Sequence, residues 1–244
     1  MLMSRDKIGQ LFMVGFDGTT VSADLAAFIK EYKPGGVILF SRNLESTEQI
    51  VDLTNELQRC SPHAPLLISI DQEGGRVSRL PNEFTIFPPC EVLGRCNSLE
   101  LAYAAAATTA KELRAVGINM NMAPVLDVNS NPANPVIGDR AFGSDPAVVC
   151  ELAVPTVGGL QDNGVVACGK HFPGHGDTTV DSHKELPLVA APRERLERIE
   201  FPPFRHAITR GVATMMTAHV LYSALDDQRP ATLSPAIIGS LLRK

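Results

Sequence analysis

Residues 164–183 read GVVACGKHFPGHGDTTVDSH, and this segment changes from apolar to polar and titratable residues along its length. The apolar run at 165–168 is typical of a strand that is buried on both faces. Pro173, Gly174 and Gly176 disfavour a helix after this run, so the strand is expected to end in a loop. That part of the chain carries the titratable side chains Lys170, His171, His175, Asp177, Asp181 and His183. Such groups at the end of a buried strand are costly unless they have a function, so the segment predicts both a strand and a site.

Similar short apolar runs recur along the chain. The strand candidates are residues 10–16, 36–40, 66–70, 118–124, 165–169 and 212–217. Each run is nearly continuous in apolar residues rather than alternating with polar ones. This pattern favours a parallel sheet that is covered by helices on its faces.

Helical patterns fill the spaces between these runs. The helix candidates are residues 98–116, 146–163, 193–209 and 234–242. Asn97 or Ser98 can cap the first of them, Asp145 the second and Ser234 the last. Pro202 and the proline after it are expected to break or kink the third helix.

The alternation of strands and helices predicts an α/β fold with a parallel sheet. A closed (β/α)8 TIM-type barrel and an open doubly wound sheet both fit this order. Polar residues follow several different strands, at Asp71, Asp127, Lys170, His171 and His219. Chemistry gathered from many strand ends favours the mouth of a barrel, and no Gly-x-Gly-x-x-Gly follows the first strand. Because the strand candidates number fewer than eight, we expect residues 1–244 to form a single barrel domain that is truncated after about six βα units.

Composition is that of an ordinary globular protein. The 244 residues are 44% hydrophobic and 20% charged, with a net charge of -5. No Lys/Arg cluster stands out, so nucleic acid is not an expected partner. The N-terminus is too polar for a signal peptide and no apolar run approaches the ~20 residues of a membrane span, so we expect a cytoplasmic protein without a membrane partner. The five cysteines lack metal-site spacing and are expected to be buried thiols rather than disulfides.

Three kinds of chemistry compete for the polar segment. Residues 164–171 nearly match a phosphate-binding loop, but His171 stands where that loop needs Ser or Thr, and we reject nucleotide binding. A metallohydrolase is a second interpretation, because histidines and aspartates are competent metal ligands, although their spacing follows no rigid geometry. The third is acid/base catalysis without metal, in which Asp181 orients His183 as a proton carrier. Taken alone, this spacing also suits an aspartate that only ties down its loop.

The segment KHFPGHG, together with Asp181, Ser182 and His183 downstream, resembles the signature of the β-N-acetylglucosaminidases in glycoside hydrolase family 3. Further similarities occur in collinear order over nearly the whole chain, at residues 35–40, 70–77, 121–128, 138–143, 217–220 and 230–234. The resemblance implies a (β/α)8-type barrel and retaining hydrolysis of terminal β-linked N-acetylglucosamine, with no cofactor and no metal. It also implies cell-wall muropeptides as substrates, in cytoplasmic peptidoglycan recycling.

When the family's residue roles are carried over by position, the resemblance implies that His183 is the general acid/base and that Asp181 is its partner. It implies sugar binding by Asp71, Arg79, Arg140, Lys170 and His171. Carboxylates accept hydrogen bonds from sugar hydroxyls, and arginine and lysine donate to hydroxyls and to an N-acetyl group. A small N-acetylglucosaminide is therefore the expected partner, and the sequence predicts no oligomeric state.

One part of the family's site has no match in the sequence. The family's nucleophile is an aspartate in a Thr-Asp-Asp-like segment at the seventh strand, which is expected only after Lys244. Asp226 and Asp227 lie in an earlier loop and are not assigned to this role. The chain alone is therefore expected to be inactive. A non-catalytic sugar-binding remnant and a phosphorylase, in which phosphate replaces water, remain as alternatives.

Overall fold

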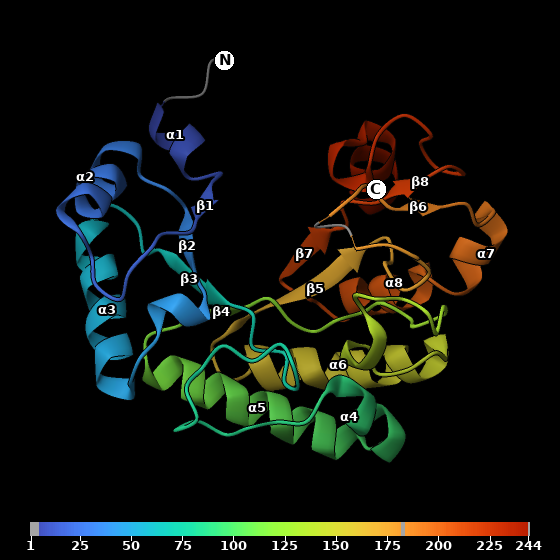
Figure 1. Ribbon diagram of the computed structural model, residues 1–244, viewed down its shortest axis with the longest axis horizontal. Helices are drawn as coiled ribbons and strands as arrows, with labels where there is room; N and C mark the ends of the chain where they lie inside the picture. Colours follow the sequence, from blue (N-terminus) through green and yellow to red (C-terminus); the bar gives the residue numbers. More distant parts are fainter. Residues whose placement is uncertain (1–4, 182–183, 244) are drawn as a thin grey trace.

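The computed structural model describes residues 5–181 and 184–243. Its centre is a curled six-stranded sheet with the strand order β1-β2-β3-β4-β5-β7 (Figure 1). The strands are β1 (Met13–Val14), β2 (Gly36–Leu39), β3 (Leu67–Ile70), β4 (Met120–Asn121), β5 (Val166–Phe172) and β7 (Thr214–Thr217). A small second sheet pairs β6 (Leu188–Val189) with β8 (Leu221–Tyr222).

Helices surround the outside of the curled sheet (Figure 1). The α-helices are α1 (Arg5–Gly9), α2 (Ala23–Tyr32), α3 (Thr47–Cys60), α4 (Cys90–Cys96), α5 (Leu99–Ala115), α6 (Pro146–Gln161), α7 (Arg193–Arg198) and α8 (Phe201–Thr209). The shorter turns are the 3-10 helices η1 (Ser41–Asn43), η2 (Gly138–Arg140) and η3 (Ala231–Leu233), and the π-helix η4 (Ala236–Leu242).

The predicted α/β architecture of barrel type is confirmed. Each of the six strand candidates contributes one strand of the large sheet, and every neighbouring pair in that sheet is parallel. Val37 of β2 pairs with Ile68 of β3, and both side chains are fully buried. Burial on both faces explains why these strands read as continuous apolar runs.

Capping residues fix where the main helices begin. The hydroxyl of Ser98 accepts a hydrogen bond from the backbone N–H of Leu101 at the start of α5. The carboxylate of Asp145 accepts one from Ala147 at the start of α6, where Pro146 takes the first helical position. Both caps agree with the sequence prediction, because these side chains satisfy N–H groups that have no partner within the helix.

Several element boundaries differ from the prediction. The strands expected at 10–16 and 118–124 shorten to β1 and β4, and the helix expected at 234–242 is the π-helix η4. The helix expected at 193–209 is two helices, and the break lies at Ile199 and Glu200, ahead of the prolines, which then occupy the first turn of α8. A proline is tolerated there because its missing N–H would have no partner in the helix. Strand β5 extends to Phe172, so Lys170 and His171 lie within the strand and not in the loop after it. The backbone of Lys170 bonds to Pro124 and Leu126, which prolongs the pairing.

The core lies between the sheet and the helices. Ile50, Leu53 and Leu57 of α3 and Ile68 of β3 belong to one buried apolar cluster. All five cysteines are free thiols, as predicted. Cys60, Cys90 and Cys168 are buried, whereas Cys150 is half-buried and Cys96 is exposed. Over residues 5–181 and 184–243, we find no helix with the length and apolar character that crossing a bilayer requires.

Candidate active site

A cavity of about 310 Å³ opens where the carboxyl ends of β3, β5 and β7 converge. Its walls are formed by Asp71, Glu73, Val77, Arg79, Val136, Arg140, Lys170, His171, His175, Met216, Thr217, Ala218 and His219. The parallel sheet explains this gathering, because all carboxyl ends lie at the same edge. The five residues predicted to bind sugar all line this one cavity.

Lys170 lies between two carboxylates at the floor of this cavity. Its Nζ is 2.7 Å from Oδ1 of Asp71, which directly follows β3, and 2.5 Å from Oε1 of Glu73. The Lys170 side chain is only 2% exposed. A charge this deeply buried is tolerated when it is paired and hydrogen-bonded, as it is here.

Glu73 also binds Arg140, which ends the turn η2. Nε and Nη2 of Arg140 each lie 2.8 Å from an oxygen of Glu73, in a bidentate ion pair. Burial alone would raise the pKa of Glu73, but Arg140 and Lys170 outweigh burial and lower this pKa to about 2. Glu73 in turn raises the pKa of Arg140, against the effect of burial. The carboxylate of Glu73 and the guanidinium of Arg140 are therefore both charged in the folded protein near neutral pH.

A second carboxylate, Asp127, lies behind the cavity wall and is fully buried. Its Oδ2 is 2.7 Å from Nδ1 of His171, and its Oδ1 accepts the backbone N–H groups of His171 and His175. Burial would raise the pKa of Asp127, but the neighbouring His171 and the other hydrogen bonds lower it. The ionised carboxylate is an acceptor only, so Nδ1 of His171 carries the proton and donates.

Arg79 completes the cationic part of the wall. Its backbone N–H donates to Oε1 of Gln72, and Gln72 itself bonds through its backbone to the side chain of Asn121. The Nε of Arg79 is buried and has no hydrogen-bond partner within the described residues. A buried donor without a partner in the wall of a cavity is a position where a ligand oxygen fits.

The loop after β5 is fastened at several points. Asp177 accepts two hydrogen bonds from Arg195 of α7, at 2.5 and 3.0 Å. The hydroxyl of Tyr222 donates to the carbonyl of Gly174 at 2.6 Å, and Asn134 donates to the carbonyl of His175 at 2.8 Å. These contacts hold residues 174–178 against the body of the protein.

Asp181 of the predicted acid/base pair follows these anchors in the sequence. The carbonyl of Asp181 accepts backbone N–H groups of Lys184 and Glu185 at 2.9 and 3.1 Å. His183, the predicted general acid/base, lies outside the described residues.

The candidate metal ligands are directed to other partners. The described residues contain no group of three or more His, Cys, Asp or Glu side chains arranged to hold a metal ion. His171 binds Asp127, His175 has Nδ1 2.9 Å from the hydroxyl of Thr178, and Asp177 binds Arg195.

Two residues that organise this cavity, Glu73 and Asp127, received no role from sequence reasoning. Asp127 stood out only as a polar residue after a strand, and Glu73 only as one letter of the segment 70–77. A signal was present for both, because each lies just beyond an apolar strand. Their partners are 44 or more residues away in the chain, so only the fold reveals the pairs.

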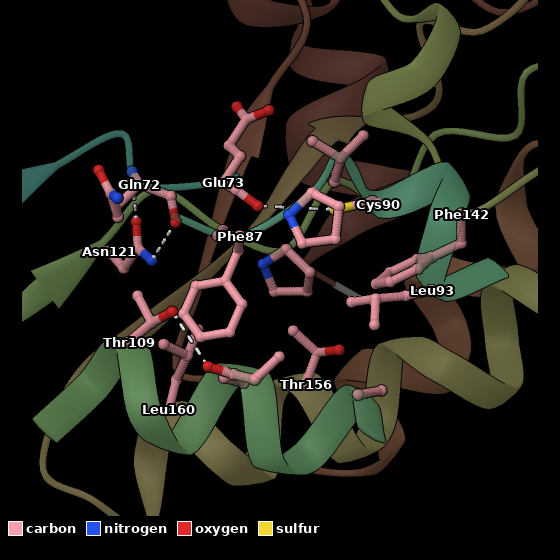
Figure 2. Close-up of a pocket in the computed structure, with 17 residues that line it drawn as sticks. Gln72, Glu73, Phe87, Cys90, Leu93, Thr109, Asn121, Phe142, Thr156 and Leu160 are labelled. Atoms are coloured by element: carbon pink, nitrogen blue, oxygen red, sulfur yellow. Dashed lines mark hydrogen bonds between the residues drawn. The ribbon is translucent and has the colours of Figure 1, made fainter. Parts of the chain in front are cut away.

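A smaller cavity of about 40 Å³ lies beneath this site, between the loop after β3 and helices α5 and α6 (Figure 2). It is lined mainly by apolar groups such as Phe87, Leu93 and Phe142. The thiol of Cys90 faces the backbone carbonyl of Glu73 there, at 3.8 Å, and burial raises the pKa of that thiol to about 12. The carboxylate of Glu73 points away from the residues that line this small cavity (Figure 2).

Comparison with known proteins gives a consistent result. The family model of the glycosyl hydrolase family 3 N terminal domain matches residues 3–244. A beta-hexosaminidase from Alkalilimnicola ehrlichii is 44% identical over 237 residues, which cover 95% of this chain and 67% of that protein. Beta-hexosaminidase A from Pseudoalteromonas piscicida is 42% identical over 92% of this chain, but the match spans only 41% of that protein.

Solved structures agree with this chain over nearly its whole length. A glycoside hydrolase family 3 beta-N-acetylglucosaminidase from Paenibacillus sp. str. FPU-7 has a TM-score of 0.96 and 52% identity, covering 100% of this chain and 47% of that one. NagZ from Neisseria gonorrhoeae, in complex with N-trifluoroacetyl-D-glucosamine, has a TM-score of 0.90 and 35% identity, covering 95% and 70%. The chain thus spans about half of the length of some relatives and about two thirds of others.

Proposed function

Because this chain belongs to glycosyl hydrolase family 3, we propose that the protein is a β-N-acetylhexosaminidase that removes terminal β-linked N-acetylglucosamine with retention of configuration. The observation that carries this proposal is the convergence of Asp71, Arg79, Arg140, Lys170 and His171 on one cavity at the carboxyl ends of the strands. In this proposal, residues 1–244 form part of a single catalytic domain.

The cavity offers groups that suit an N-acylated sugar. Asp71 accepts hydrogen bonds from sugar hydroxyls, while Arg79 and Lys170 donate to hydroxyl or carbonyl oxygens. The Nε of Arg79 has no hydrogen-bond partner among the residues that the structure describes, and it gains one when a sugar enters. The ligand in the neisserial NagZ structure is an N-acylated glucosamine, which supports the same class of substrate for this chain.

His183 moves the proton in this proposal. In the first step the imidazolium protonates the departing glycosidic oxygen, while a carboxylate attacks the anomeric carbon to form a glycosyl-enzyme. In the second step the neutral imidazole takes a proton from water, which attacks the same carbon and releases the sugar. Asp181 orients the imidazole. Asp71 and Glu73 are both bound to Lys170, so neither is assigned as the attacking carboxylate, which the family resemblance puts on a later strand.

The finer assignments come from the family resemblance. We propose that the substrates are muropeptides released during cell-wall turnover and that the protein acts in the cytoplasm. A phosphorylase is the second candidate, favoured by Arg79 in the cavity wall, whose Nε has no hydrogen-bond partner within the described residues and is a donor that phosphate could use in the second step.

The test uses the full-length gene product and an aryl β-N-acetylglucosaminide. Release of the aryl group together with free β-N-acetylglucosamine supports the hydrolase, whereas β-N-acetylglucosamine 1-phosphate formed only with added phosphate supports the phosphorylase. Binding of N-acetylglucosamine without turnover would identify a non-catalytic sugar-binding protein. A protein that neither binds nor cleaves the sugar contradicts the proposal.

A further inference from the structure

We propose that Glu73 is a positioning residue that fixes Arg140 and Lys170 in one arrangement at the cavity and cancels one of their charges, so that the site selects an uncharged sugar over an anion. This inference rests on the proposed function, because it concerns how the same cavity chooses its ligand.

The carboxylate of Glu73 binds Arg140 and Lys170 and is not assigned to direct sugar binding. Oε1 accepts from Nη2 of Arg140 at 2.8 Å and from Nζ of Lys170 at 2.5 Å, and Oε2 accepts from Nε of Arg140 at 2.8 Å. The Glu73 side chain is 2% exposed. With both oxygens engaged, its effect on a ligand passes through the two cations.

Both cations have few donors left for a ligand. The ammonium of Lys170 has three N–H donors, and two of them are directed to Asp71 and Glu73. Arg140 donates hydrogen bonds from Nε and Nη2 to Glu73, and from Nη1 to the carbonyl of Val136 at 3.2 Å. The remaining N–H groups therefore point in fixed directions, and a side chain held in this way loses little rotamer freedom when a sugar binds.

Charge gives Glu73 a second role. Among the four side chains that bind one another, Asp71 and Glu73 carry two negative charges against the two positive charges of Arg140 and Lys170. This balance leaves Arg79 as the cation of the cavity wall outside the cluster. Arg140 and Lys170 are nearly buried, at 12% and 2% exposed, so an unbalanced charge there acts at short range with little screening by water. Removing the charge of Glu73 leaves the cluster with one excess positive charge.

Two substitutions separate positioning from charge. Glu73→Gln keeps the size of the side chain but loses its charge. Its amide N–H₂ takes the place of one carboxylate oxygen, so a donor of Arg140 or Lys170 loses its acceptor. Glu73→Asp keeps the charge but is one methylene shorter, so it cannot reach both cations as Glu73 does. Thr54→Val is the matched control, because Thr54 is a buried hydroxyl that bonds the carbonyl of Val116 at 2.8 Å and does not line the cavity.

The experiment is a calorimetric titration of the full-length protein and its variants with N-acetylglucosamine and, separately, with inorganic phosphate. For Glu73→Gln we expect sugar affinity to fall about 10-fold or more, the scale of a lost hydrogen bond to a charged group, and phosphate affinity to rise above that of the wild type. For Glu73→Asp we expect weaker sugar binding without any gain in phosphate binding. Thr54→Val is expected to lower the melting temperature and leave both affinities unchanged.

The outcomes distinguish a failure of this inference from a failure of the proposed function. If the wild type binds the sugar and folded Glu73→Gln binds both ligands as the wild type does, the inference is wrong and the proposed function stands. If only Glu73→Asp folds, unchanged sugar affinity in that variant overturns the inference. A wild type that does not bind the sugar removes the proposed function and this inference with it.

Discussion

Nδ1 of His171 lies 2.7 Å from Oδ2 of Asp127, whose carboxylate is completely buried. Asp127 also accepts the backbone N–H groups of His171 and His175, so one side chain fixes the imidazole and the backbone around it. The ring is held with Nδ1 as the donor to Asp127, which leaves Nε2 as the ring nitrogen that can face a ligand. This pair is distinct from the predicted acid/base pair of Asp181 and His183.

Replacing Asp127 with Asn is the direct test of that relationship. The amide donates where the carboxylate accepted, which favours the opposite tautomer of His171 and turns Nε2 into a donor. We expect kcat/KM of the full-length enzyme to fall roughly 10- to 100-fold, the scale of a lost hydrogen bond to a charged group. Nitrogen NMR of the imidazole should report the change of tautomer.

Asp162→Asn is the control for this substitution. Asp162 caps the end of α6 and accepts a hydrogen bond from Tyr103 at an exposed position away from the cavity. Its replacement is expected to leave kcat/KM within about 2-fold, as is usual for exposed substitutions. A normal kcat/KM in Asp127→Asn would mean that the state of His171 does not matter for turnover.

The role of His183 predicts a dependence on the leaving group. We expect His183→Ala to slow hydrolysis at least ~100-fold for a substrate with a poor leaving group, the usual scale of acid/base catalysis. The loss in the first step should shrink for an aryl group that departs easily, because such a group needs little help from an acid. The measurement is a series of aryl β-N-acetylglucosaminides of increasing leaving-group pKa.

His63→Ala serves as the comparison for His183→Ala. His63 is an exposed histidine between α3 and β3 and is expected to show no change over the same series. Full activity of His183→Ala with the poorest leaving group would remove the assigned role of this histidine.

Close packing of the loop predicts a strong effect at Gly176. A Cβ built there would overlap the backbone carbonyl oxygen of Val128, and backbone cannot yield as a side chain can. We expect Gly176→Ala to lower the free energy of unfolding by about 1–3 kcal/mol or more and to displace the segment that leads to Asp181. Urea denaturation and kcat measure the two effects.

Gly239→Ala offers the matched substitution in open space. Apart from its chain neighbours and the backbone of its own helix η4, no heavy atom of the described residues lies within 4 Å of a Cβ at Gly239. We therefore expect the stability of Gly239→Ala to equal or slightly exceed that of the wild type. Equal stabilities of Gly176→Ala and Gly239→Ala would contradict the packing argument.

The strands were predictable because their signal is local. Burial on both faces leaves a continuous apolar run at each strand, and residues such as Val37 and Ile68 show it in the sequence. The end of β5 was misjudged because Lys170 and His171 are polar, and their place in the strand depends on pairing with residues near Pro124. A break in the helix expected at 193–209 was predicted, but it was placed at the prolines and not at Glu200, where the structure has it.

The cavity was predictable only in part, because its chemistry depends on pairs. Asp71 and Lys170 stood out as polar residues near strand ends, and the family resemblance added Arg79 and Arg140. The role of Glu73 was not readable, because a glutamate in the sequence looks the same whether it is solvated or buried between two cations. Its partners lie 67 and 97 positions further along the chain, at Arg140 and Lys170, and only the curled sheet brings them together.

The lowered pKa of Glu73 predicts how stability depends on pH. This pKa is about 2 in the folded protein against 4.5 for the ordinary side chain, so the folded state binds the proton less tightly than the unfolded state. The stabilisation is therefore fully present above about pH 4.5, falls as the pH drops toward 2, and amounts to about 3 kcal/mol. Glu73→Gln lacks this group, so the difference in unfolding free energy between wild type and variant should shrink steadily from pH 5 to pH 2 in urea denaturation. A difference that stays constant over this range would show that the carboxylate of Glu73 is not held ionised by Arg140 and Lys170.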